Sequence, residues 1–131
     1  MFQMFNGCSK LTSLILTNFD TSLVTTMTSM FSSCSSLVEL DLSSFKIPLV
    51  GIMSNMFKEC EKLEYINLNN SFEKKSGLKI IDMFDSIPIN VVICINKNNS
   101  KITSLISNIT CAIIDCSNDW KKNQKKILFG K

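Results

Sequence analysis

Histidine and arginine are absent from this sequence of 131 residues, and alanine occurs once, as Ala112. Without histidine the chain lacks the commonest general base and the usual partner of a nucleophilic cysteine. The sequence also contains no Cys-x-x-Cys pair, no glycine-rich phosphate loop and no zinc signature. These absences argue against an enzyme, and we expect no catalytic residue, no cofactor and no metal site.

Charge of either sign is scarce outside the C-terminus. All 14 basic residues are lysines, and the formal net charge is +3. Five of these lysines lie in the last eleven residues, which leaves residues 1–120 with 9 lysines against 11 acidic residues. A slightly acidic body argues against a nucleic-acid partner. No apolar run reaches the length of about 18 residues that a membrane span needs, so we expect no span in this stretch.

A strict internal period is the strongest feature of the sequence. The pairs Met4-Phe5, Met30-Phe31, Met56-Phe57 and Met83-Phe84 are spaced 26, 26 and 27 residues apart. Each unit also contains a Leu-x-x-Leu-x-Leu pattern, whose last three residues alternate between apolar and other side chains, as in a short strand. The same register holds for the cysteines and for the alternating pairs: Cys8, Cys34 and Cys60, then Leu14/Leu16, Leu40/Leu42 and Ile66/Leu68.

The rest of each unit suggests a helix. Apolar residues recur there at steps of three to four, as on one face of a helix: Val24, Met27, Met30, Phe31 and Cys34. One repeat is then a strand plus a helix, and it must stack on its neighbours to bury its apolar face. The sequence therefore predicts an α/β fold, a right-handed leucine-rich-repeat solenoid of about four to five strand-helix repeats with a parallel sheet on one face.

Residues 30–45, which read Met-Phe-Ser-Ser-Cys-Ser-Ser-Leu-Val-Glu-Leu-Asp-Leu-Ser-Ser-Phe, resemble the 26-residue repeat of BspA-like surface proteins. The resemblance covers residues 1 to about 86 and includes Asn-Phe-Asp-Thr-Ser at residues 18–22. It weakens toward the C-terminus, where Ile87 replaces the expected cysteine. The resemblance implies a cell-surface or secreted protein that adheres to host, matrix or neighbouring-cell proteins.

The period divides the chain into two parts. Residues 1–87 hold three regular units and the start of a fourth, and residues 88–131 are degenerate repeats with strands expected at 91–95 and 111–116. Two helices are expected here, with these apolar residues facing the sheet: Ile102, Leu105, Ile106 and Ile109, then Trp120, Gln124, Ile127 and Leu128 in a C-terminal cap. Because the chain opens within a repeat, we expect a longer array, with signal peptide and anchor outside this stretch.

The cysteines fall into two groups. Cys8, Cys34 and Cys60 are expected to be core thiols that behave as small hydrophobes. Cys94 instead occupies an outward strand position, where a thiol invites pairing. In an extracellular protein Cys94 would bond to Cys111 or to Cys116, and the sequence leaves both partners open.

The remaining candidate for function is the outward side of the sheet. Its expected binding residues are Ile15, Glu39, Asp41, Tyr65 and Asn67. A mostly polar surface with one aromatic ring and one exposed aliphatic side chain is compatible with protein binding, and also with a solvated scaffold. The leading hypothesis is a cell-surface or secreted protein-binding module for adhesion or cell contact. The alternative is an intracellular leucine-rich-repeat interaction scaffold, in which all six cysteines stay reduced.

Overall fold

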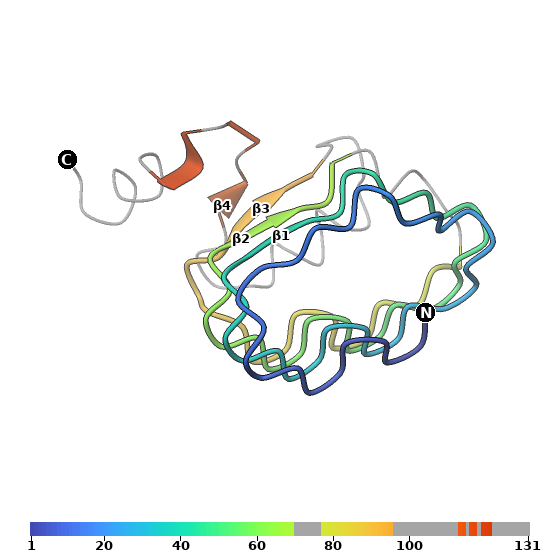
Figure 1. Ribbon diagram of the computed structural model, residues 1–131, viewed down its shortest axis with the longest axis horizontal. Coiled ribbons are helices and arrows are strands. Elements are labelled where there is room, and N and C mark those ends of the chain that lie inside the picture. Colours follow the sequence, from blue (N-terminus) through green and yellow to red (C-terminus); the bar gives the residue numbers. More distant parts are fainter. Residues whose placement is uncertain (70–76, 96–112, 115, 118, 122–131) are drawn as a thin grey trace.

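The protein is built from turns of chain that follow the same closed path one behind another, as Figure 1 shows. The computed structural model describes residues 1–69, 77–95, 113–114, 116–117 and 119–121. One side of this path carries a parallel sheet with the strand order β1-β2-β3-β4. The strands are short: β1 (Glu39–Asp41), β2 (Tyr65–Asn67), β3 (Val92–Cys94) and β4 (Ile113–Ile114).

The sequence period sets the register of this sheet. Glu39 pairs with Tyr65, 26 residues later, and Tyr65 pairs with Val92, 27 residues later. Alternation within the strands is as expected, because Leu40 and Ile66 point into the core with 2% and 0% of their surface exposed. The strands at these places and the inward direction of their central residues are therefore confirmed.

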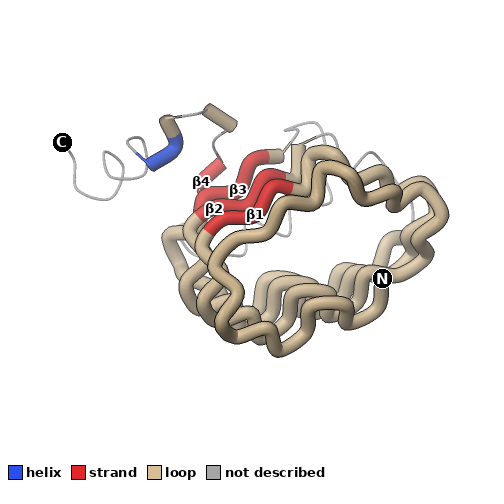
Figure 2. The backbone as a smooth tube through the Cα atoms, viewed as in Figure 1, coloured by secondary structure: helices blue, strands red, loops and turns tan. Residues whose placement is uncertain are grey.

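The side of the path opposite the sheet is not helical, which corrects the expected fold class. No residue within 1–69 or 77–95 is helical, and Figure 2 shows only strands and loops over these stacked turns. Trp120 and Lys121 are the only helical residues among those described. The expectation of a right-handed α/β leucine-rich-repeat solenoid of four to five strand-helix repeats is therefore wrong.

Backbone hydrogen bonds between neighbouring turns take the place of the expected helices. The N–H groups of Ser29 and Phe31 donate to the carbonyls of Ser54 and Met56, each at 3.0 Å. The residues between them bond locally instead, since the N–H of Met30 donates to the carbonyl of Met27 at 3.3 Å. An α-helix needs bonds from residue i to residue i−4 throughout, so this alternation of local and cross-turn bonds excludes one.

Left-handed backbone conformations recur in the same segment and keep it from coiling into a helix. Ser29 and Ser33 have φ of 52° and 59°, and their counterparts Asn55 and Glu59 have φ of 58° and 61°. In the first turn one of these positions is Gly7, with φ of 73°. L-residues with large or β-branched side chains avoid this region, which explains why small or polar residues stand here.

The helix expectation failed because apolar spacing alone does not distinguish a helix from a series of tight turns. Met27, Met30, Phe31 and Cys34 are all fully buried, so the apolar face was identified correctly. Steps of three to four also bring side chains to one side when each local bond joins residue i to residue i−3. Serines at 29, 32, 33, 35 and 36 bond readily to nearby backbone and favour turns over helix.

Identical side chains stack from turn to turn to fill the core. The ring centroids of Phe31 and Phe57 lie 5.8 Å apart with an interplanar angle of 3°, and Phe5 and Phe84 extend the stack at 5.4 Å and 5.5 Å. Near-parallel rings at this spacing form favourable aromatic pairs. The repeated phenylalanine thus positions each turn over the next.

A column of thiols follows the same register. The Cys34 Sγ donates to the Phe5 carbonyl and the Cys60 Sγ to the Phe31 carbonyl, both at 3.1 Å. Burial raises the pKa of the Cys34 thiol to about 11 and that of the Cys60 thiol to about 12. Cys8 is exposed, contrary to expectation.

Leu40→Ala should lower the free energy of unfolding by roughly 2–5 kcal/mol, because it leaves a cavity beneath β1. Leu23→Ala is the matched control, since the Leu23 side chain is 82% exposed and its loss should change stability by less than about 0.5 kcal/mol. Urea unfolding of both variants measures the difference. Equal midpoints for the two variants would contradict the inward direction of Leu40.

The free thiols should differ in reactivity under native conditions. At pH 8 an alkylating reagent should modify Cys8 within minutes and leave Cys34 and Cys60 intact, because burial shields these two thiols and holds them protonated. Mass spectrometry of the labelled protein, with a urea-unfolded sample as the positive control, counts the modified cysteines. Rapid native labelling of Cys60 would disprove the thiol column.

Candidate functional site

The outer face of the sheet brings together four of the five residues expected to bind a ligand. Glu39 pairs with Tyr65, and Asp41 with Asn67, across β1 and β2. Glu39, Tyr65 and Asn67 are half-buried, whereas Asp41 is exposed. The fifth residue, Ile15, lies outside the strands in the preceding turn and has 85% of its surface exposed.

Two of these residues have a structural task. The Asp41 Oδ1 accepts a hydrogen bond from the Ser43 N–H at 2.8 Å, and the Asn67 Oδ1 accepts one from the Asn69 N–H at 3.0 Å. Side-chain bonds of this kind, to the backbone two residues on, form turns and end a strand. Asp41 and Asn67 thus mark the ends of β1 and β2, and their recurrence in the sequence follows from this role.

A short C-terminal segment lies against the outer face of the sheet. Its described residues, called the clasp here, are Cys116, Ser117, Asp119, Trp120 and Lys121. The Trp120 ring stacks on the Tyr65 ring with centroids 4.8 Å apart and an interplanar angle of 12°. Trp120 is only 7% exposed and packs with Val92 as well as Tyr65. The clasp therefore covers part of the expected binding surface.

Charge complements this ring stack. The Lys121 Nζ lies 2.6 Å from the Glu39 Oε1 and 5.1 Å from the centroid of the Trp120 ring. The hydrogen bond to Glu39, together with the charges of Glu39 and Glu64, raises the pKa of the Lys121 ammonium group. Both side chains of the pair are substantially exposed, so water and salt screen it and it adds little stability.

A disulfide joins the clasp to the sheet. Cys94, in β3, is bonded to Cys116 across a sequence separation of 22. Cys94 is 2% exposed, whereas Cys116 is exposed. The sequence left Cys111 and Cys116 as alternative partners, and Cys111 lies outside the described residues. The bond fixes the clasp over β2 and β3, the strands that carry Tyr65 and Val92.

The disulfide is the strongest of the links that hold the clasp. A stacked aromatic pair contributes about 0.5–1.5 kcal/mol beyond its buried area. Ordering the backbone of one residue costs about 1–2 kcal/mol, so fixing several residues exceeds what the ring stack returns. A disulfide that closes a loop of about this length contributes roughly 3 kcal/mol by restricting the unfolded chain. Without the covalent bond the clasp is held by the ring stack, the exposed ion pair and the two residues of β4 that pair with β3.

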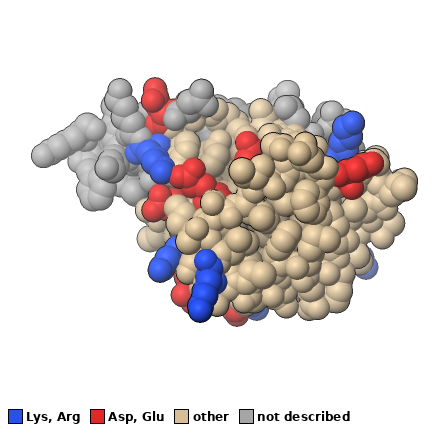
Figure 3. Space-filling view, in the orientation of Figure 1, with Lys and Arg blue, Asp and Glu red and all other residues tan. Residues whose placement is uncertain are grey.

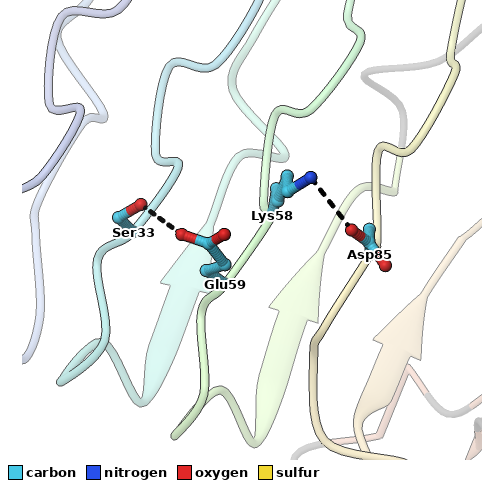
Figure 4. A network of polar contacts seen from close by, with 4 residues as sticks. All are labelled: Ser33, Lys58, Glu59 and Asp85. Carbon is cyan, nitrogen blue, oxygen red and sulfur yellow. Dashed lines mark hydrogen bonds and ion pairs between the residues drawn. The ribbon is translucent and has the colours of Figure 1, made fainter.

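A second polar surface lies away from the sheet, along the turns of the Met-Phe segments (Figure 4). The Ser33 Oγ donates to the Glu59 Oε2 at 2.7 Å, and the Lys58 Nζ lies 3.1 Å from the Asp85 Oδ2. The hydrogen bond to Asp85 raises the pKa of the Lys58 ammonium group. These pairs join neighbouring turns and satisfy one another, so this surface is a less favourable ligand site than the sheet face.

The position of the clasp was not predicted from the sequence. Trp120 was expected to face the sheet as part of a helical cap with Gln124, Ile127 and Leu128. These three residues lie outside the described part of the chain, as does the helix that was expected to contain Ile102 and Ile109. Trp120 does contact the sheet, on its outer face. The signal that could have indicated this contact is the residue types, because Trp120 and Tyr65 are the single tryptophan and the single tyrosine of the chain.

Two other kinds of site are absent from the described residues. There, no group of three or more His, Cys, Asp or Glu side chains is arranged to hold a metal ion. Across the same part of the chain, no helix has the length and hydrophobicity needed to cross a membrane.

A family model matches most of the chain. The model of a family described as Mycoplasma protein of unknown function, DUF285, matches residues 1–93. No curated protein and no solved structure matches the chain. The resemblance to the BspA-like leucine-rich-repeat family is thereby corrected, because a different family covers the residues on which that resemblance was based.

Proposed function

Because the chain belongs to the DUF285 family of Mycoplasma proteins, whose function is unknown, we propose a function from its own surface. The chain acts as a cell-surface or secreted module that binds a protein ligand on a host cell, in the matrix or on a neighbouring cell. The observation that carries this proposal is the outer sheet face, which holds a polypeptide segment through an aromatic stack and an ion pair. Aromatic anchors of this kind are enriched at protein interfaces.

The Cys94–Cys116 bond supports the extracellular part of the proposal. Disulfides form and persist in oxidising compartments, whereas the cytosol keeps most thiols reduced. An intracellular scaffold would hold both cysteines as thiols and would lose the link between the clasp and β3. The bond therefore favours the extracellular module over the scaffold.

The uncovered part of the surface supports contact with protein. Ile15 is 85% exposed and Asp41 is exposed, so an aliphatic and a charged side chain remain available beside the clasp. Figure 3, which views the end of the stack of turns, shows lysines and acidic residues interspersed around an uncharged area, with no large patch of one sign. A surface without a single dominant charge suits a protein ligand better than a polyanion.

Binding by this module would rely on many weak contacts. Neighbouring turns repeat the same backbone path, so each presents side chains at the same spacing across the sheet. When many copies are displayed on one cell, each further contact becomes intramolecular and the effective affinity rises without new chemistry. Adhesion then needs no single dominant residue.

Antibodies against this protein should stain intact, unpermeabilised source cells, because the proposed module is displayed outside the membrane. The comparison is with permeabilised cells of the same culture, stained in parallel with an antibody against a cytosolic protein as the control for leakage. Staining that requires permeabilisation would refute surface display and favour the intracellular scaffold.

The combined variant Ile15→Lys and Asp41→Lys should reduce adhesion of protein-coated beads to target cells by about tenfold or more, since it adds bulk and changes charge on the open surface. The matched control combines Lys58→Ala with Asp85→Ala on the other polar surface. Beads coated with this control variant should adhere like beads coated with the unmodified protein. Melting curves check that all variants fold. Full adhesion by the Ile15 and Asp41 variant would exclude this face.

A further inference from the structure

We infer that Glu39, Tyr65 and Val92 form a docking site for an aromatic side chain followed by a lysine on another polypeptide. The chain's own Trp120 and Lys121 occupy this site until the Cys94–Cys116 bond is reduced. This inference rests on the proposed protein-binding function and names both the chemistry of the partner and the control of access.

The bound clasp defines the chemistry that the site accepts. Tyr65 presents a ring face that takes a second ring at 4.8 Å, and Val92, which is fully buried, supplies an apolar wall to the same cluster. Glu39 takes the ammonium group of the next residue at 2.6 Å. An aromatic side chain with a lysine directly after it can contact Tyr65, Val92 and Glu39 together, because its ring packs on the first two and the next residue supplies the cation for Glu39.

The site spans three strands that the fold holds in fixed register. Glu39 lies in β1, Tyr65 opposite it in β2, and Val92 opposite Tyr65 in β3. Their spacing is therefore set by backbone pairing and does not depend on the clasp. When the clasp leaves, the three side chains remain placed to receive a similar segment.

The disulfide decides whether an external segment can compete. With the bond closed, Trp120 is tethered four residues from Cys116, which is itself joined to β3 beside the site. Such a tether gives Trp120 an effective concentration in the millimolar range or above, and a free peptide must exceed this to displace it. With the bond open, the contacts that remain are the ring stack, the exposed ion pair and the pairing of the two-residue strand β4 with β3, six residues before Trp120.

A dithiol opens the bond, and Cys116 is the more accessible of the two bonded residues, because Cys116 is exposed whereas Cys94 is 2% exposed. A thiolate of the dithiol bonds to the Cys116 Sγ, the Cys94–Cys116 bond breaks, and Cys94 leaves as a thiolate that takes a proton. The second thiolate of the dithiol then attacks the first sulfur of the same dithiol, the bond from that sulfur to the Cys116 Sγ breaks, and Cys116 leaves as a thiolate that takes a proton. The protein disulfide is reduced by two electrons and the dithiol is oxidised to a cyclic disulfide.

The test measures binding of a labelled peptide with the sequence of residues 117–123, which contains tryptophan, lysine and no cysteine. Fluorescence anisotropy compares the oxidised full chain, the chain reduced with dithiothreitol, and an oxidised Trp120→Ala variant, which keeps the disulfide but vacates the ring site. The reduced chain and the variant should bind the peptide at about 100-fold lower concentration than the oxidised chain. Emission from Trp120, the single tryptophan, should shift to longer wavelength on reduction.

Two controls define the specificity. Tyr65→Ala in the Trp120→Ala background should abolish peptide binding, and a peptide with alanine in place of its tryptophan should not bind any form. Cys94→Ser with Cys116→Ser should bind the peptide with or without dithiothreitol, and urea unfolding verifies that each protein is folded. Absence of binding to the vacated Trp120→Ala variant would overturn the docking site, and equal binding to oxidised and reduced chains would overturn control by the disulfide.

The peptide-binding test and the adhesion test can fail independently of each other. Adhesion of the unmodified protein depends on the surface around Ile15 and Asp41, which the clasp leaves exposed. Adhesion without peptide binding would leave the module intact and remove the docking site. Peptide binding without adhesion or surface staining would support the site while refuting the extracellular role.

Discussion

Backbone hydrogen bonds between successive turns are the interaction on which the rest of this structure depends. On one side they pair β1 with β2 and β2 with β3, and on the other they join the Met-Phe segments, as in the bond from Phe31 to Met56. Both sets of bonds join residues that are one repeat apart in the sequence. The repeat that ends at β3 has one extra residue, and β2 and β3 still pair in register. Because each turn satisfies the backbone of the next, the buried chain needs no helix to bond its polar groups.

The sequence predicted the strands because their signal is local and unambiguous. Leu40 and Ile66 sit between polar or half-buried neighbours, and an alternation of period two places such residues on opposite faces. It could not predict the opposite side, since Met27, Met30 and Cys34 have spacing that suits both a helix and a row of turns. The better indicator was Gly7, Ser33 and Glu59 in register, with positive φ in every turn. A column that includes glycine signals a left-handed position, which a continuing helix does not accept.

The sequence predicted which residues share the outer face of the sheet, but not the contacts that these residues make there. Alternation put Glu39, Asp41, Tyr65 and Asn67 on one face, and the strand register brings them together there. Nothing local revealed that Asp41 and Asn67 end their strands through side-chain bonds, or that Trp120 lies over Tyr65. The last contact joins residues 55 apart in the sequence and depends on the path of the chain between them. Long-range contacts of this kind follow from the whole fold, which single-residue patterns do not encode.

Cysteine has two roles in this protein, and position relative to the core separates them. Cys34 and Cys60 lie between stacked turns, where burial keeps them protonated and each thiol donates to a carbonyl of the turn before. Cys94 lies in a strand with its sulfur toward the outer face, where it meets Cys116. The first pair contributes to packing whatever the surroundings, whereas the disulfide exists only where the surroundings are oxidising. The packing of Cys34 and Cys60 is thus independent of redox conditions, whereas the link between the clasp and β3 depends on them.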